Sequence, residues 1–366
     1  MYKDLDSEKL KREYLKEAVL SYPPRHITIG VTSSCNNKCL FCSYHGNDAK
    51  GHSKVYQLPF MLSYTEFVKI ADMAADGGVR RIHVCGTGEP FLNPEILNML
   101  DYIIKVFGKV SFQTNFWKEL FDKKNYLDEI IKRAEYIDYV TIDVCSSLPE
   151  EHEYIKQGAS YIELLDSLEY IAKRSNIKIM PFLILTKYNY KHLKGIIDQF
   201  LERKINNFQL NIGNLFSYDY SEFTSSDNVY VSTDYEITEK LNEIVSYGRE
   251  KGIVVTVPRP ADYQNEICNV FWDKFQTWPV QGCEEGRYGE NMIPHACAAV
   301  VNGGLNSLGY IFDYDSIMDA WNSERLVQIR RNLLEGKYPS ENCKKCYCYH
   351  LEDSYYKQKV REVLNE

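Results

Sequence analysis

The distribution of apolar and polar residues along the chain predicts alternating strands and helices. Short apolar, β-rich runs bounded by turn residues are typical of strands; they lie at 26–32, 80–86, 108–114, 137–145, 177–185 and 207–212. Between them, apolar residues recur at helical spacing, which predicts helices at 64–77, 94–107, 118–134, 159–174 and 190–203. Alternation of this kind indicates βαβ units around a parallel sheet.

A further amphipathic pattern precedes the first strand. Residues 5–20 place Leu10, Tyr14, Leu15 and Val19 on one helical face, and Pro23-Pro24 would end the helix. We therefore expect residues 1–24 to form an N-terminal helix.

Composition is that of an ordinary globular protein. The length of 366 residues suggests roughly two domains. With 44% hydrophobic and 26% charged residues, the chain can form a core without disulfides. A net charge of -8 argues against a nucleic-acid surface. No apolar run approaches the ~20 residues of a membrane span, and the N-terminus is too polar for a secretory signal. We expect a cytoplasmic protein that binds neither nucleic acid nor membrane.

Three of the eleven cysteines share one short loop. Cys35, Cys39 and Cys42 follow directly on the apolar run at 27–31. A cubane iron–sulfur cluster takes four thiolates, so three local cysteines leave one iron open to another ligand. The alternative is a zinc loop. Zinc loops usually pair cysteines two apart and need a distant second pair, and this spacing does not match.

A second motif combines a strand with a glycine-rich turn. Residues 81–90 read Arg-Ile-His-Val-Cys-Gly-Thr-Gly-Glu-Pro. Glycine allows the backbone to approach a ligand closely, and Glu89 offers a carboxylate to an ammonium group.

Together these motifs resemble those of radical S-adenosylmethionine (SAM) enzymes, in which an aromatic residue, here Phe41, precedes the third cysteine. In that family the SAM amino and carboxylate groups chelate the open iron of a [4Fe-4S] cluster. SAM is then cleaved to a 5'-deoxyadenosyl radical that abstracts a hydrogen atom from substrate. The resemblance implies that Cys35, Cys39 and Cys42 hold the cluster. It also implies that SAM is bound by Phe41, Gly86, Thr87, Gly88 and Glu89, where Thr87 departs from the commonest Gly-Gly-Glu-Pro form.

The resemblance covers about residues 25–260 and implies a partial (β/α)6 barrel with its chemistry at the carboxyl ends of the strands. Polar residues at those ends, Asn115, Asp143 and Asn211, are candidates for SAM binding, and a role as polar strand caps is the alternative. Cys145 could donate a hydrogen atom to a substrate radical, as an epimerase requires. The alternative is that Cys145 is a small buried hydrophobe.

A second set of cysteines, Cys283, Cys297, Cys343 and Cys346, could fill every ligand position of a structural zinc ion or a second iron–sulfur cluster. The surrounding segments resemble the twitch or SPASM extension of radical SAM enzymes. We therefore expect residues 261–366 to form a small auxiliary-cluster domain with a C-terminal helix, holding a second [4Fe-4S] cluster. Cys348 could replace Cys346 as the last ligand.

The resemblance implies an oxidoreductase that takes electrons from a donor such as flavodoxin or ferredoxin. We expect a small polar substrate, a carbohydrate or aminocyclitol, that is dehydrogenated or epimerised. The alternative is a maturase of ribosomally made peptides. Such maturases often carry an N-terminal leader-binding module, and the roughly 25 residues before the first strand are too few for one. An iron–sulfur protein that only passes electrons would not explain an open-iron triad beside a SAM-binding turn.

Overall fold

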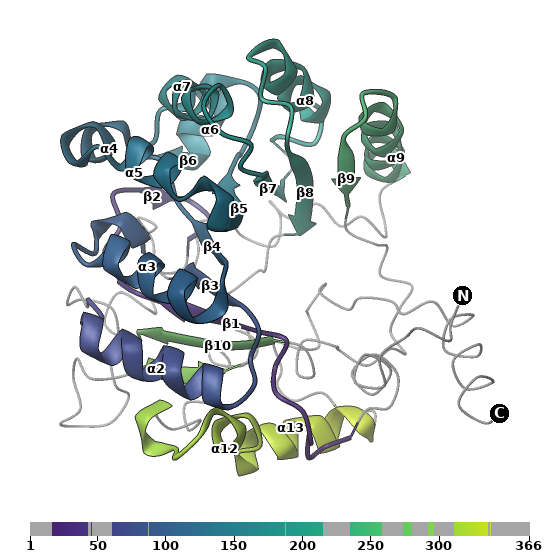
Figure 1. Ribbon diagram of the computed structural model, residues 1–366. Helices are drawn as coiled ribbons and strands as arrows, with labels where there is room; N and C mark the ends of the chain where they lie inside the picture. The colour runs from purple at the N-terminus through teal and green to yellow at the C-terminus, as the bar shows by residue number, and fades with distance from the viewer. Residues whose placement is uncertain are drawn as a thin grey trace.

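The computed structural model describes residues 17–42, 45, 61–86, 88–186, 188–214, 235–257, 274–279, 292–295, 311–335 and 337. Its main feature is a curved nine-stranded sheet in the order β11-β10-β1-β3-β4-β5-β7-β8-β9 (Figure 1). Every neighbouring pair is parallel except β10 with β11. The strands are β1 (His26–Gly30), β3 (Ile82–Cys85), β4 (Val110–Gln113), β5 (Ile137–Asp143), β7 (Ile179–Leu185), β8 (Gln209–Asn214), β9 (Val254–Thr256), β10 (Lys274–Pro279) and β11 (Met292–His295).

All six predicted strands are confirmed, and a mostly parallel α/β sheet consistent with a partial barrel is present. Each predicted strand contains side chains that are removed from water, such as Ile27 and Ile29 in β1 and Val84 in β3, all 0% exposed. Burial of these apolar side chains is the dominant favourable term in forming the sheet.

Helices surround the outer side of the sheet (Figure 1). The crossover helices are α2 (Tyr64–Asp76), α3 (Ile96–Phe107), α7 (Tyr161–Ala172), α8 (Leu193–Glu202) and α9 (Tyr235–Glu250). Their buried faces join the side chains of the strands in one core cluster. The arrangement leaves the carboxyl ends of the strands free for loops that carry polar side chains.

The helix predicted at 118–134 is two helices, α4 (Lys118–Lys124) and α5 (Tyr126–Lys132). Asn125 between them adopts a left-handed conformation with φ of 53°. A residue in that conformation ends the helical hydrogen-bond ladder, and asparagine tolerates it better than most residues. A short helix, α6 (Pro149–Ile155), was not predicted.

The N-terminal helix predicted to reach residue 20 does not do so. Residues 5–16 lie outside the described ranges, and residues 17–20 are irregular. The backbone N–H of Leu20 donates to Oδ1 of Asn322 at 2.8 Å, and Nδ2 of Asn322 donates to the Leu20 carbonyl at 2.8 Å. These side-chain bonds satisfy the Leu20 N–H, which a helix would have paired, and its carbonyl, which would have been unpaired at the helix end.

Asn322 belongs to a C-terminal helix pair, α12 (Ile317–Trp321) and α13 (Glu324–Leu334). From α13, the buried guanidinium of Arg330 donates to the carbonyls of Ala18 and Trp321. The segment before β1 and the C-terminal helix pair are therefore held together by hydrogen bonds.

Strand β10 lies beyond the expected barrel boundary at residue 260, and it pairs in parallel with β1. Strand β11 adds an antiparallel edge to β10. None of the helices within the described ranges is long and apolar enough to cross a membrane.

Candidate active site

The cysteine loop leaves the carboxyl end of β1 and is held at its middle by a distant segment. Lys38–Cys39 (β2) pairs antiparallel with Lys156–Gln157 (β6), so that Cys39 lies opposite Lys156. The backbone N–H of Leu40 donates to the Ile155 carbonyl at 2.9 Å. The loop is therefore fixed by main-chain hydrogen bonds to the segment between α6 and α7.

The three thiols of this loop, Cys35, Cys39 and Cys42, are partly buried and electrostatically coupled. Burial raises the pKa of Cys35 to about 11 and the pKa of Cys39 well above its usual range, and the Cys42 thiol adds to both shifts. Within the described residues, no three His, Cys, Asp or Glu side chains form a site for a single metal ion. A cubane distributes its ligands over separate irons, so its thiols need not converge on one point. Three thiols on one loop are a donor set that fits such a cluster.

The glycine-rich turn after β3 packs directly against the cysteine loop. A Cβ on Gly88 would lie 2.0 Å from the Ser34 carbonyl oxygen, so only glycine fits there. The next residue, Glu89, donates its backbone N–H to the same Ser34 oxygen at 2.8 Å. Gly86 is also close-packed, since a Cβ there would lie 3.1 Å from Cα of Gly30. Thr87 lies outside the described residues.

The carboxylate of Glu89 is almost completely buried and is held by three donors. Its Oε1 accepts from the Phe91 N–H at 3.1 Å and from Oγ1 of Thr114 at 2.8 Å. Its Oε2 accepts from the Asn115 N–H at 2.6 Å. Burial raises the pKa of Glu89, and these three bonds oppose the shift. A carboxylate has about four lone-pair sites, so one remains for a further donor such as an ammonium group.

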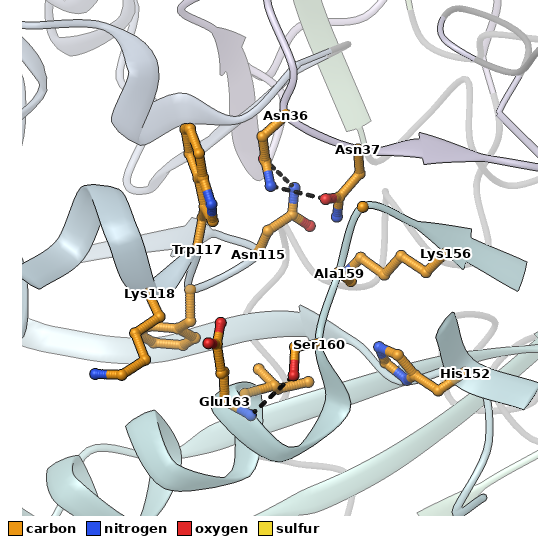
Figure 2. Close-up of a pocket in the computed structure, with 13 residues that line it drawn as sticks. Asn36, Asn37, Asn115, Trp117, Lys118, His152, Lys156, Ala159, Ser160 and Glu163 are labelled. Atoms are coloured by element: carbon orange, nitrogen blue, oxygen red, sulfur yellow. Dashed lines mark hydrogen bonds between the residues drawn. The ribbon is translucent and has the colours of Figure 1, made fainter. Parts of the chain in front are cut away.

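Asn115 joins the end of β4 to the cysteine loop. Its Nδ2 donates to Oδ1 of Asn36 at 3.2 Å and lies 3.7 Å from Sγ of Cys35. Figure 2 shows the side chains of Asn36 and Asn115 next to each other, with Asn37 beside them. The predicted site residue Asn115 therefore does lie beside the predicted cluster ligand Cys35.

Asp143 lies at the end of β5 in a chain of polar contacts. The Cys85 thiol donates to Oε1 of Gln113 at 3.0 Å, and Nε2 of Gln113 donates to Oδ2 of Asp143 at 3.1 Å. Nζ of Lys156 is 4.0 Å from the same Oδ2 and donates to the Asp143 carbonyl at 3.3 Å. Three parallel strands and β6 thus present linked polar groups beside the cysteine loop.

The buried Lys156 is a functional candidate that the sequence did not reveal. Burial alone would lower its pKa, but Asp143 and the thiols of Cys39 and Cys145 outweigh that effect, so that the pKa is raised. Lysine is rarely buried unless it is paired. In the sequence Lys156 resembles an exposed lysine, since only the pairing of β6 with β2 brings it to the loop.

Phe41 and Cys145 lie in a small apolar cluster. Cys145 is 4% exposed and packs with Leu40 and Ile155, and Phe41 packs against this group. Burial raises the pKa of Cys145 to about 12, so the thiol keeps its proton at neutral pH. Its surroundings suit a small hydrophobe, and the hydrogen-donor role stays a prediction.

Asn211 is not brought to the cysteine loop by any contact within the described part of the chain. It lies inside β8, which extends to Asn214, and not at the strand end. Its Oδ1 accepts from Oγ1 of Thr256 at 2.8 Å, which links β8 to β9. Cys283, Cys297, Cys343 and Cys346, with Cys348, lie outside the described residues.

Comparison with known proteins agrees with this arrangement. The profile of the family described as Radical SAM superfamily matches residues 29–200. The antilisterial bacteriocin subtilosin biosynthesis protein AlbA of Bacillus subtilis (strain 168) is 37% identical over 93 residues, which are 25% of this chain and 18% of that protein. A GTP 3',8-cyclase of Aquifex aeolicus (strain VF5) is 26% identical over 268 residues, which are 66% of this chain and 77% of the cyclase.

Among solved structures, SuiB of Streptococcus suis bound to S-adenosylmethionine is similar, with a TM-score of 0.63 at 18% identity. The match covers 88% of this chain and 70% of SuiB. At this identity the likeness concerns the fold alone. The residues that match the radical SAM family model, 29–200, include both the cysteine loop and the glycine-rich turn.

Proposed function

We propose that this chain is a radical SAM enzyme. The observation that carries the proposal is the packing of the glycine-rich turn onto the cysteine loop through Gly88 and Ser34. This packing places the buried carboxylate of Glu89 at the start of the three-thiol loop, and the pairing of β6 with β2 places the buried ammonium of Lys156 at its middle. Such a pair complements the ammonium and carboxylate groups of a methionyl end, because charge-assisted hydrogen bonds are the stronger ones.

In this proposal, Cys35, Cys39 and Cys42 hold a [4Fe-4S] cluster, and Glu89 and Lys156 orient SAM. When bound, the cluster and SAM would supply a 5'-deoxyadenosyl radical able to remove a hydrogen atom from substrate. The protein contributes position and protection. The close-packed turn fixes the carboxylate, β6 fixes the ammonium, and the apolar group around Phe41 and Cys145 limits access of water.

The experiment compares the reconstituted wild type with the Cys35→Ala, Cys39→Ala, Cys42→Ala variant. We expect reduced wild type to convert SAM to 5'-deoxyadenosine and the variant to make none. If the variant retains this activity, the proposal fails. Lys156→Met should weaken SAM binding by at least tenfold, because removing one partner of a buried charge pair is costly, and Lys38→Met on the exposed side of the loop is the matched control.

We propose a small polar substrate, a carbohydrate or aminocyclitol, and an oxidative or epimerising outcome. The support is the row of linked polar groups from Cys85 through Gln113 to Asp143, which suits a hydroxylated ligand. The second candidate is maturation of a ribosomally made peptide, which the identity to the subtilosin biosynthesis protein favours. The two differ in which class of deuterium-labelled compound, aminocyclitols or peptides, transfers its label to 5'-deoxyadenosine.

We further propose an auxiliary cluster held by Cys283, Cys297, Cys343 and Cys346, in a domain spanning residues 261–366. In a dehydrogenase that cluster would accept the second electron of the substrate. Metal analysis should find iron for two cubanes and little zinc. Stoichiometric zinc with iron for one cubane would contradict this part of the proposal.

A further inference from the structure

The side chain of Lys156 is fixed at both of its ends. At the backbone, Lys156 is paired with Cys39 of the cysteine loop, which holds its Cα in place. At the tip, Nζ donates to the Asp143 carbonyl at 3.3 Å. The main chain there is fixed as well, because the next residue, Val144, donates its N–H to the Phe182 carbonyl in β7 at 2.9 Å. With 2% of the side chain exposed, the fold sets the position of the ammonium.

The Asp143 carboxylate compensates this buried charge without occupying its hydrogen-bond donors. Its Oδ2 lies 4.0 Å from Nζ of Lys156, which is within the range of an ion pair but too far for a hydrogen bond. An ammonium has three N–H groups, and the Asp143 carbonyl takes one of them within the described part of the chain. Lysine is rarely buried unless it is paired, and this pairing leaves two N–H groups for a ligand.

The carboxylate of Asp143 is itself oriented by a neighbouring strand. Its Oδ2 accepts from Nε2 of Gln113 at 3.1 Å, and Oε1 of Gln113 accepts from the Cys85 thiol at 3.0 Å. Because an ionised carboxylate only accepts hydrogen bonds, Gln113 must direct its N–H₂ group at Asp143 and its oxygen at the thiol. The bonds therefore hold Oδ2 on the side of Asp143 that faces Lys156.

These contacts bear on how Asp143 could assist SAM binding. A carboxylate at the end of β5 could contact SAM directly, as the sequence suggested. The oxygen that lies nearest to Lys156, however, already accepts a hydrogen bond from Gln113. An indirect role uses the contacts that are present, since the carboxylate then acts on SAM through the ammonium that it faces.

We propose that Asp143 is a positioning residue for Lys156, supported by Gln113, and that it directs two N–H groups of the lysine at the carboxylate of SAM. This inference rests on the proposed function and adds to it the residues that orient one SAM contact. The Asp143 side chain is 22% exposed, so contact with substrate is compatible with this role, and the test is made without substrate.

The test measures how the reconstituted protein recognises a carboxylate. SAM and decarboxylated SAM are the two probes, and equilibrium dialysis gives the ratio of their affinities, here called the SAM preference. Wild type should prefer SAM. Asp143→Asn keeps the shape of the side chain and an acceptor for Gln113 but removes the charge, so it should lower the SAM preference about tenfold. Affinity for decarboxylated SAM should be nearly unchanged.

A double-mutant cycle shows whether Asp143 acts through Lys156. Lys156→Met should lower the SAM preference at least as much as Asp143→Asn does. Adding Asp143→Asn to Lys156→Met should then have no further effect, because the residue on which Asp143 acts is gone. Additive losses would mean that Asp143 contacts SAM independently, and they would overturn the proposal.

Asp138 provides the matched control on the same strand. It lies near the amino end of β5, at the other end from Asp143, and its Oδ1 is 3.8 Å from Nζ of Lys109. Asp138→Asn should keep the wild-type SAM preference. If Asp143→Asn does not fold or load iron, Gln113→Met decides the question. It should lower the SAM preference by a smaller factor, and a wild-type value would contradict the proposal.

The outcomes distinguish this inference from the proposed function. If Lys156→Met lowers the SAM preference and Asp143→Asn does not, the positioning role of Asp143 fails and the proposed SAM contact of Lys156 stands. If Lys156→Met keeps the wild-type preference, the contact of Lys156 fails, and the positioning role fails with it. Formation of 5'-deoxyadenosine tests the cysteine loop separately from both.

Discussion

At the scale of single residues, Glu89 accepts three internal hydrogen bonds and, in the proposed function, also binds SAM, so that one substitution affects both roles. A Glu89→Gln side chain must direct its amide N–H₂ either at the Asn115 N–H or at the Phe91 N–H. We therefore expect both weaker SAM binding and a loss of about 1–3 kcal/mol in the free energy of unfolding. SAM affinity by equilibrium dialysis and urea unfolding measure the two effects.

Glu95→Gln is the matched control, because Glu95 is near the same turn and accepts one exposed side-chain bond, from Asn98. It should leave both quantities unchanged. Wild-type SAM affinity in Glu89→Gln would remove Glu89 from the SAM site. Wild-type stability would mean that its three internal hydrogen bonds contribute little.

His152 makes stability depend on pH. Burial, and then the nearby Lys156 charge, lower its pKa in the folded protein to about 3, below the ordinary 6.5. Between these two values the imidazole is protonated in the unfolded chain and neutral in the folded protein. The free energy of unfolding therefore falls as pH is lowered from 6.5 towards 3. In His152→Asn this decline should be shallower by up to about 1.4 kcal/mol per pH unit. Urea unfolding at several pH values provides the comparison, and parallel curves would contradict the buried neutral ring.

At the scale of elements, the contact between the glycine-rich turn and the cysteine loop leaves no room for a larger residue at position 88. In Gly88→Ala the new Cβ must displace the Ser34 carbonyl, which is backbone and cannot move alone. We expect a folded protein that incorporates much less iron, with weaker SAM binding. Gly86→Ala, with a looser contact to Gly30, should show a smaller loss. Iron content after reconstitution, beside circular dichroism, measures this, and full iron in Gly88→Ala would contradict the tight contact.

Elements were predictable where the sequence carries a local signal. The six strands each contain buried apolar residues, as Ile27 and Ile29 do in β1. The sequence of strand β10, Lys-Phe-Gln-Thr-Trp-Pro, has no continuous apolar run, and the strand is defined by its pairing with β1. The break at Asn125 was missed because apolar spacing continues on both sides of it.

The candidate site residues also divide into those that a local motif indicates and those that depend on a pairing between distant segments. Cys35, Cys39, Cys42 and Glu89 could be proposed from the sequence because their spacing is local. Lys156 was not found, since its position depends on a pairing between β2 and β6, which are far apart in the sequence. Helix α9 was not predicted, although its sequence has a helical pattern. Its apolar residues Ile237, Leu241 and Ile244 recur at helical spacing and are buried.

At the scale of the whole molecule, Asn322 ties the segment before β1 to the C-terminal helix pair. Asn322→Ala removes two reciprocal hydrogen bonds with the Leu20 backbone. We expect a loss of about 1–3 kcal/mol in the free energy of unfolding and faster cleavage near residue 20 in limited proteolysis. Asn332→Ala, on the exposed part of α13, is the control and should behave as wild type. Unchanged cleavage would mean that the two segments are held by apolar packing alone.

The position of β1 has a consequence for synthesis on the ribosome. Strand β1 emerges first of the sheet strands, but it is hydrogen-bonded on one edge by β3 and on the other by β10, which is made much later. Until Lys274–Pro279 leaves the exit tunnel, one edge of β1 stays open, and an open edge can pair with another chain. The cysteine loop begins at the end of that same strand. Nascent chains therefore have an interval in which the strand that leads into the loop is paired on one edge only, and loading of the proposed cluster in that interval would compete with misassembly.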